Sequence, residues 1–159
     1  MSRKKSKSQE LREVVKMRLI PFIFSRGFEI DERELYKSDP YGHQTHRFMR
    51  WNGDKLELLE IQFDKYGRAK FVFNIGVVPP EGVENPVCHY NQLNVGIPRL
   101  PRRVRLRAGR YLGSWFGLST SKILFIRKRS ADDVIDFAIQ LFPQAEAWLR
   151  KGIVGPNIG

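Results

Sequence analysis

The stretch Leu59-Glu-Ile-Gln-Phe-Asp-Lys-Tyr-Gly67, followed by Phe71-Val-Phe-Asn-Ile-Gly-Val77, alternates apolar and polar side chains along most of its length. Alternation with a period of two is typical of a β-strand with one buried face, because successive side chains point to opposite faces. The residues between the two runs, 65–68, favour a turn. The sequence therefore predicts two neighbouring antiparallel strands. Their expected buried face carries Leu59, Ile61, Phe63, Phe71, Phe73, Ile75 and Val77.

Further strands are expected on both sides of this pair. Residues 28–37 and 45–51 are candidate strands separated by the turn sequence Asp39-Pro-Tyr-Gly42, and Asn52-Gly53 is a strong hairpin signal. Beyond the meander, residues 103–108 alternate arginines with apolar residues, and 122–127 form a short apolar run. These segments extend the pair to an antiparallel meander of five or six strands.

A helix is expected over residues 9–24. Leu11, Val15 and Leu19 recur at a spacing of four, which makes an apolar stripe along one helix face. Ser8 is the expected N-cap. Pro21 is expected to kink or end this helix, because proline lacks the amide donor and crowds the preceding turn.

A second helix is expected near the end of the chain. Ser130-Ala-Asp-Asp133 has the pattern of a capping box, and Gly152 is a suitable helix end. Together with the meander, these helices indicate an α+β fold in which an antiparallel sheet carries the N- and C-terminal helices on one face.

The composition indicates one domain over residues 9–152, preceded by a disordered basic tail at 1–8 and followed by a frayed end at 153–159. Residues 79–103 are rich in proline and arginine and are expected to form an irregular excursion. The lone Cys88 excludes an intramolecular disulfide, and neither a membrane-spanning run nor a secretory signal is found in the sequence. We therefore expect a cytoplasmic protein with no membrane association.

Positive charge is concentrated in one segment. The chain has a net charge of +11, and residues 85–131 contain no Asp or Glu but many Lys and Arg. Such a field attracts an acidic partner unless carboxylates of the chain itself neutralise it. The candidate polyanion-binding residues are Arg99, Arg102, Arg103, Arg105, Arg107, Arg110, Arg127, Lys128 and Arg129.

Two interpretations of this basic segment compete. Alternate residues of a strand lie about 6.6 Å apart on one face, so the arginines of 103–107 form a regular row that could follow a phosphate backbone. Tyr111 and Trp115 are candidates for stacking on bases, although a large aromatic residue such as Trp115 is more often part of a core. Alternatively, the arginines pair across strands with the polar face of the meander.

That polar face consists of Glu60, Gln62, Asp64 and Asn74. Carboxylates there could carry out acid–base chemistry if they were partly buried, but solvated outer-face residues are the usual outcome. The sequence offers no catalytic residues and predicts neither a cofactor nor a metal. His43, His46, His89 and Cys88 lack the spacing of a metal site.

The order of these elements resembles the bacterial domain family of unknown function numbered 4304. The resemblance is carried by Ser25-Arg-Gly-Phe28, by the two strand sequences quoted above, by Arg105-Leu-Arg-Ala-Gly109 before Trp115-Phe116, and by Ala147-Trp-Leu149. It covers residues from about 24 to 150, with a longer Pro/Arg-rich segment here and Phe116 in place of a second Trp. The resemblance implies an α+β domain and a bacterial source, but no activity.

Taken together, the sequence favours a non-enzymatic binding module that interacts with other proteins. One alternative is a nucleic-acid-binding domain that uses the basic strand of Arg99–Arg110. The other is an enzyme with an unrecognised pocket. The expected partner is an acidic protein or a nucleic acid, and the sequence leaves the oligomeric state open.

Overall fold

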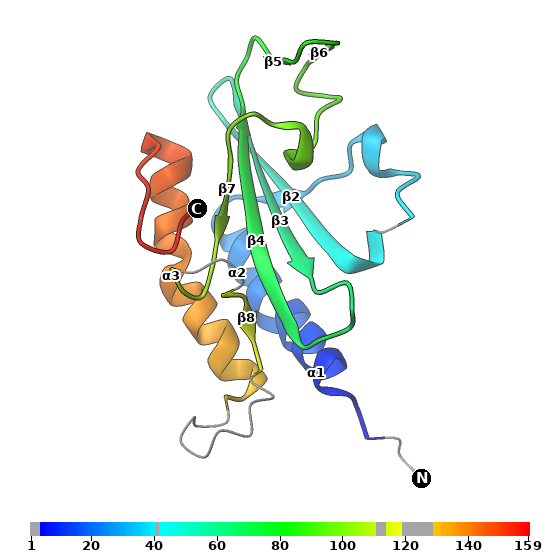
Figure 1. Cartoon of the computed structure of the whole chain (residues 1–159), viewed down its shortest axis with the longest axis vertical. Helices are drawn as coiled ribbons and strands as arrows, with labels where there is room; N and C mark the ends of the chain where they lie inside the picture. The colour runs from blue at the N-terminus through cyan, green and yellow to red at the C-terminus, as the bar shows by residue number, and fades with distance from the viewer. Residues whose placement is uncertain (1–3, 41, 111–113, 119–128) are drawn as a thin grey trace.

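The computed structural model describes residues 4–40, 42–110, 114–118 and 129–159. Its main element is an antiparallel sheet in the order β1-β2-β3-β4-β7, with β8 paired to β4 (Figure 1). The strands are β1 (Glu29–Ile30), β2 (Thr45–Asn52), β3 (Lys55–Phe63), β4 (Lys70–Val78), β7 (Arg103–Leu106) and β8 (Phe116–Gly117). A separate small hairpin pairs β5 (Val83–Glu84) with β6 (His89–Tyr90). The α+β fold with a six-stranded meander is as the sequence predicts.

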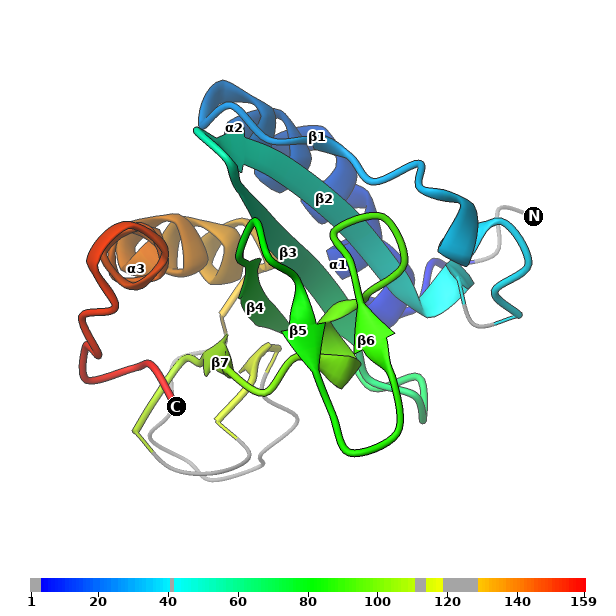
Figure 2. The same ribbon diagram turned by 90° about the horizontal axis from the view of Figure 1, so that it is seen from above.

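Helices cover one face of this sheet, as expected (Figure 2). The N-terminal helix consists of α1 (Lys7–Val14), a π-helical turn (Val15–Leu19) and α2 (Ile20–Ser25). The C-terminal helix is α3 (Ala131–Lys151). Within the described ranges, no helix combines the length and apolar character that a bilayer crossing requires.

The main core lies between the helices and the sheet. Phe71 stacks on Phe116 with ring centroids 5.3 Å apart, and Phe73 contacts Phe142 of α3 edge to face at 5.7 Å. All four rings are almost completely buried. Such aromatic contacts add to the free energy gained by removing large apolar surfaces from water. The apolar residues that alternate along β3 and β4 therefore form the sheet side of the core, as the sequence predicts.

The N-terminal helix differs from expectation at its first residues. It starts at Lys7 with Ser6, not Ser8, as the N-cap, because a capping box forms between Ser6 and Gln9. Pro21 does not end the helix. The chain widens into a π-helical turn just before it, in which the Ile20 amide bonds to the Val15 carbonyl. A π-turn can absorb the donor that proline lacks.

The C-terminal helix begins and ends where the sequence predicts. Ser130 and Asp133 form the reciprocal hydrogen bonds of a capping box. Gly152 ends the helix in the left-handed region, with φ of +67°. This conformation favours glycine because it has no Cβ.

Two expectations about segment structure are wrong. Residues 28–37 form only the two-residue strand β1 before a 3₁₀ turn at Glu34–Tyr36. The last residues do not fray, because Gly159 and Arg105 exchange two backbone hydrogen bonds of 2.8 and 3.0 Å and the Arg107 amide donates to the Asn157 carbonyl. The end of the chain thus pairs with the outer edge of β7, and Ile158 is buried.

The excursion after β4 packs on the opposite face of the sheet. It contributes Val95, Ile97 and Leu100 to a second core, which covers Leu56 and Leu58 of β3. This close approach depends on Gly76 of β4, since a Cβ atom built there lies 2.3 Å from Leu100 Cδ1. The proline-rich segment is therefore a structural cover over one half of the second face.

A buried ionic cluster connects the helices to the sheet. Arg50 of β2 donates to Glu57 of β3 through Nε (2.6 Å) and to both carboxylate oxygens of Glu146 on α3 (3.1 Å each). Arg26, at the end of α2, also donates to Glu146. Burial by itself would raise the pKa of Glu146, but the hydrogen bonds and charges of Arg50 and Arg26 outweigh it and hold this pKa below its ordinary value.

The contact at Gly76 makes a stability prediction. Gly76→Ala is expected to lower the free energy of unfolding by about 1–3 kcal/mol, because the added methyl group must displace the buried Leu100 side chain. Gly42→Ala is the matched control, since a Cβ atom at Gly42 meets nothing within 4 Å. Urea denaturation of both variants measures the difference. Equal stabilities would mean that the excursion does not rest on β4 as described.

The cluster around Glu146 makes a prediction about pH. A carboxylate with a lowered pKa stabilises the folded state above the unfolded-state value of about 4.5, and this contribution disappears as the pH falls through the folded-state value. Glu146→Gln is therefore expected to cost about 1–3 kcal/mol at pH 7 and clearly less at pH 3. Urea denaturation of both proteins at the two pH values measures the gap. A gap independent of pH would contradict the assignment.

Candidate functional site

The second face of the sheet is divided into two halves. The excursion covers the apolar half, and the polar half forms an open pocket of about 600 Å³. This volume is in the usual range for ligand sites in proteins, about 300–1,000 Å³. The residues that line it are Gln44, Thr45, Arg47, Glu60, Gln62, Lys65, Asn74, Ile97, Pro98, Arg103, Val104, Arg105, Arg107 and Gly159.

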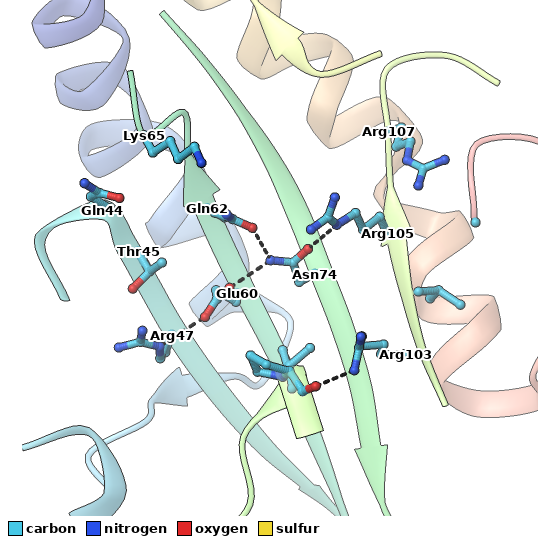
Figure 3. Close-up of a pocket in the computed structure, with 14 residues that line it drawn as sticks. Gln44, Thr45, Arg47, Glu60, Gln62, Lys65, Asn74, Arg103, Arg105 and Arg107 are labelled. Carbon is cyan, nitrogen blue, oxygen red and sulfur yellow. Dashed lines mark hydrogen bonds and ion pairs between the residues drawn. The ribbon is translucent and has the colours of Figure 1, made fainter. Parts of the chain in front are cut away.

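A chain of hydrogen bonds crosses the floor of this pocket (Figure 3). Arg105 of β7 donates through Nε to Asn74 Oδ1 of β4 at 2.8 Å. Asn74 Nδ2 donates to Glu60 and Gln62 of β3, both at 2.8 Å. Arg47 of β2 donates through Nε to the other oxygen of Glu60 at 3.1 Å. One polar network therefore connects four neighbouring strands.

The chemistry of these groups fixes the orientation of the Asn74 amide. A guanidinium only donates hydrogen bonds, so the atom facing Arg105 must be the oxygen. The nitrogen then faces Glu60, which only accepts when it is ionised, and the oxygen of Gln62. With its oxygen used in this way, Gln62 keeps its own amide donors for other partners.

The pocket is strongly positive. Five of its lining residues are basic and one, Glu60, is acidic. Arg47 is shared between Glu60 and Asp39. Burial would lower the pKa of Arg47, but the hydrogen bonds and charges of these two carboxylates raise it above its ordinary value. Arg47 therefore stays charged and donates a hydrogen bond to Glu60.

The row of arginines on β7 has its expected alternation. Arg103, Arg105 and Arg107 all line the pocket, whereas Leu106 is part of the main core and Val104 contacts both. Arg103 is held by the carbonyl groups of Pro98 and Leu100. Cross-strand ion pairing of this row is not found among the described residues, because β4 separates β7 from β3 and Asn74 stands between Arg105 and Glu60.

The other basic candidates lie outside the pocket. Arg102, Arg110 and Arg129 are exposed, and Arg129 lies over the ring of Phe137. Arg99 is also exposed and donates to the Tyr90 hydroxyl at 2.9 Å. Arg127 and Lys128, together with the expected strand 122–127, fall outside the described residues.

The stacking candidates do not join this site within the described part of the chain. Trp115 is half-buried, does not line the pocket, and has the Lys70 ammonium 5.1 Å from its ring centre. Its neighbour Phe116 is a core residue. Tyr111 falls outside the described residues. The described lining of the pocket contains no aromatic side chain.

Asp64, which is expected on the polar face with Glu60 and Gln62, does not line the pocket. It follows the last residue of β3 and accepts hydrogen bonds from the amides of Tyr66 and Arg68 and from the Arg68 side chain. Burial would raise the pKa of Asp64, but these hydrogen bonds lower it. The signal was present in the sequence, since Asp at the start of a glycine-containing turn commonly bonds to the turn amides.

Sequence reasoning missed the part of the site that comes from β2 and the turns. Arg47, Thr45 and Gln44 reach the pocket because β2 pairs with β3 in the register Arg47↔Glu60. Lys65 reaches it from the β3–β4 turn. The alternation of β2 could have placed Thr45 and Arg47 on one face, but it does not say which carboxylate they meet.

The residues considered for a metal are not brought together. His46 packs edge to face on Phe63 on the helix side of the sheet, while His89 is in β6 and Cys88 precedes it as an exposed thiol. Burial, with the charges of Lys16 and Arg12, lowers the pKa of His46. Over the part of the chain that the structure describes, no group of three or more His, Cys, Asp or Glu side chains is placed to hold an ion.

Comparison with protein-family models, curated proteins and solved structures finds no match to this chain. What is inferred about its function therefore rests on the geometry and charge of the pocket.

The pocket contains one buried polar atom without a described partner, Thr45 Oγ1. A buried hydroxyl without a hydrogen bond costs free energy. Thr45→Val, which has the same shape, is expected to leave stability unchanged or raise it by up to about 1 kcal/mol. Thermal and urea denaturation test this. A loss of more than about 1 kcal/mol would show that the hydroxyl is hydrogen-bonded in solution.

Proposed function

We propose that this chain is a non-enzymatic binding domain that recognises an acidic segment of a partner protein at the pocket between β2 and β7. The observation that carries the proposal is the excess of basic side chains in the pocket, where five basic side chains and one acidic side chain, the Glu60 carboxylate, form the lining. Both oxygens of that carboxylate already accept hydrogen bonds from neighbouring strands. The remaining positive charge is available to an acidic partner.

The burial of Glu60 and its hydrogen bonds to neighbouring strands support a binding role over a catalytic one. A general acid or base must be able to exchange a proton with a substrate. Glu60 instead holds Asn74 and Arg47 in place, and is 7% exposed. We propose that Glu60 has a structural role, because it orients Asn74, which in turn positions Arg105.

A nucleic acid is the second candidate partner. The row Arg103, Arg105 and Arg107, with Arg99, Arg102 and Arg110 exposed nearby in the sequence, favours contacts to a phosphate backbone. Recognition of single strands usually adds aromatic side chains on which bases stack. Since the described lining has none, we rank an acidic protein first.

The proposed context is a bacterial cytoplasm. This part of the proposal is supported by the resemblance of the strand and turn sequences to the domain family of unknown function 4304, and by the single cysteine.

The test is a fluorescence-anisotropy titration at two salt concentrations. The probes are labelled glutamate-rich peptides, single-stranded RNA, single-stranded DNA, duplex DNA and heparin. The pocket variant is Arg105→Glu/Arg107→Glu, and the charge-matched control is Arg102→Glu/Arg110→Glu, which lies outside the pocket. Circular dichroism confirms that each variant is folded.

We expect the acidic peptides to bind and to lose about tenfold or more in affinity in the pocket variant, with a much smaller loss in the control. A preference for one nucleic acid, lost in the same variant, would instead support the second candidate. Equal weak binding of every polyanion, reduced alike in both variants, would show that the pocket recognises nothing and that only net charge acts.

A further inference from the structure

The free hydrogen-bond donors of the pocket outnumber its free acceptors, of which the Thr45 hydroxyl is one. The oxygens of Asn74, Gln62 and Glu60 are each used by a neighbouring side chain. The unused donors include the amide nitrogen of Gln62, the terminal nitrogens of Arg105, the guanidinium of Arg107 and the ammonium of Lys65, within the residues that the structure describes. A ligand that satisfies these groups must consist mainly of acceptor oxygens.

Two of the arginines are already held in place before any ligand binds. Asn74 fixes the Nε of Arg105, so the two terminal nitrogens of that guanidinium remain free above the sheet (Figure 3). The carbonyl groups of Pro98 and Leu100 hold Arg103 beside it. Donors fixed in advance lose less conformational entropy on binding, which favours recognition of a compact anion.

The charge and the number of donors favour a dianion over a single carboxylate. A carboxylate offers one negative charge and two oxygens, whereas a phosphate monoester carries about −1.5 to −2 charges and three strong acceptor oxygens at pH 7. Four of the basic lining side chains have no carboxylate partner among the described residues: Lys65, Arg103, Arg105 and Arg107. Arginine forks match phosphate oxygens in pairs.

We propose that this pocket is a binding site for a phosphate monoester, with Arg105 and the Gln62 amide as donors on its floor and with Lys65 and Arg107 on opposite sides of them (Figure 3). The inference rests on the proposed function, and it specifies the acidic partner as a protein segment that presents a phosphorylated side chain. The pocket volume of about 600 Å³ leaves room for the phosphate and the residues beside it. Gln62 provides the neutral donor that distinguishes this site from a purely electrostatic patch.

The experiment uses three degenerate, acid-biased nonapeptide libraries that differ only at the central position, which is phosphoserine, serine or glutamate. Inorganic phosphate and free phosphoserine serve as competitors. The protein variants are Arg105→Gln/Arg107→Gln, Gln62→Leu, and the matched control Arg102→Gln/Arg110→Gln. Affinities are measured by anisotropy at near-physiological salt, and unfolding curves confirm that each variant is folded.

We expect the phosphoserine library to bind about tenfold or more tightly than the glutamate library. The preference should disappear in Arg105→Gln/Arg107→Gln, weaken in Gln62→Leu, and remain in the control. A weaker preference in Gln62→Leu together with unchanged binding of the glutamate library would be a result that net charge alone cannot produce.

Other outcomes separate this inference from the function on which it rests. Equal binding of the phosphoserine and glutamate libraries would overturn the phosphate site and leave the acidic-partner function standing. Binding of free phosphoserine and inorganic phosphate without any gain from the peptide would support the phosphate site and overturn the protein partner. If no probe binds, both proposals are wrong.

Discussion

The register between β3 and β4, which pairs Leu59 with Ile75 and Glu60 with Asn74, is the constraint on which the rest of the structure depends. It places the aromatic and aliphatic residues of both strands on the helix side and the polar residues on the other. A slip of one residue would exchange the two faces, removing Phe71 and Phe73 from the core and the Asn74 amide from the pocket. The same strand pairing therefore positions the core on one face of the sheet and the candidate site on the other.

The second face of the sheet has an apolar half, which the excursion covers, and a polar half, which forms the open pocket. Gly76 lets the excursion approach β4 closely and bury Leu58 under Leu100. Two residues away on the same strand face, Asn74 begins the open polar half. The cover itself contributes to the site, since it holds Arg103 through backbone carbonyl groups. Loss of packing at Gly76 would thus also change the position of Arg103 in the pocket.

The arrangement of charge explains how a basic face can be stable without being neutralised. The carboxylate on this face, Glu60, is committed to Arg47 of β2. Arg105 of β7 meets a neutral amide instead. The amide nitrogen of Asn74 donates to Glu60 and Gln62, and its oxygen accepts from Arg105. This side chain therefore connects the paired charges of Glu60 and Arg47 with the unpaired charge of Arg105.

The sequence by itself determined the elements whose signals are local. The alternation of β3, β4 and β7, the capping box at Ser130 and the helix end at Gly152 each depend on a few adjacent residues, so they could be predicted, as could the α+β fold. Only the tertiary structure decided which charges meet. Whether Arg105 reaches Glu60 or Asn74 depends on strand order, and the pairing of Gly159 with β7 joins residues more than fifty positions apart. No local pattern encodes such contacts, because they arise when distant segments compete for the same sheet edge and the same buried partners.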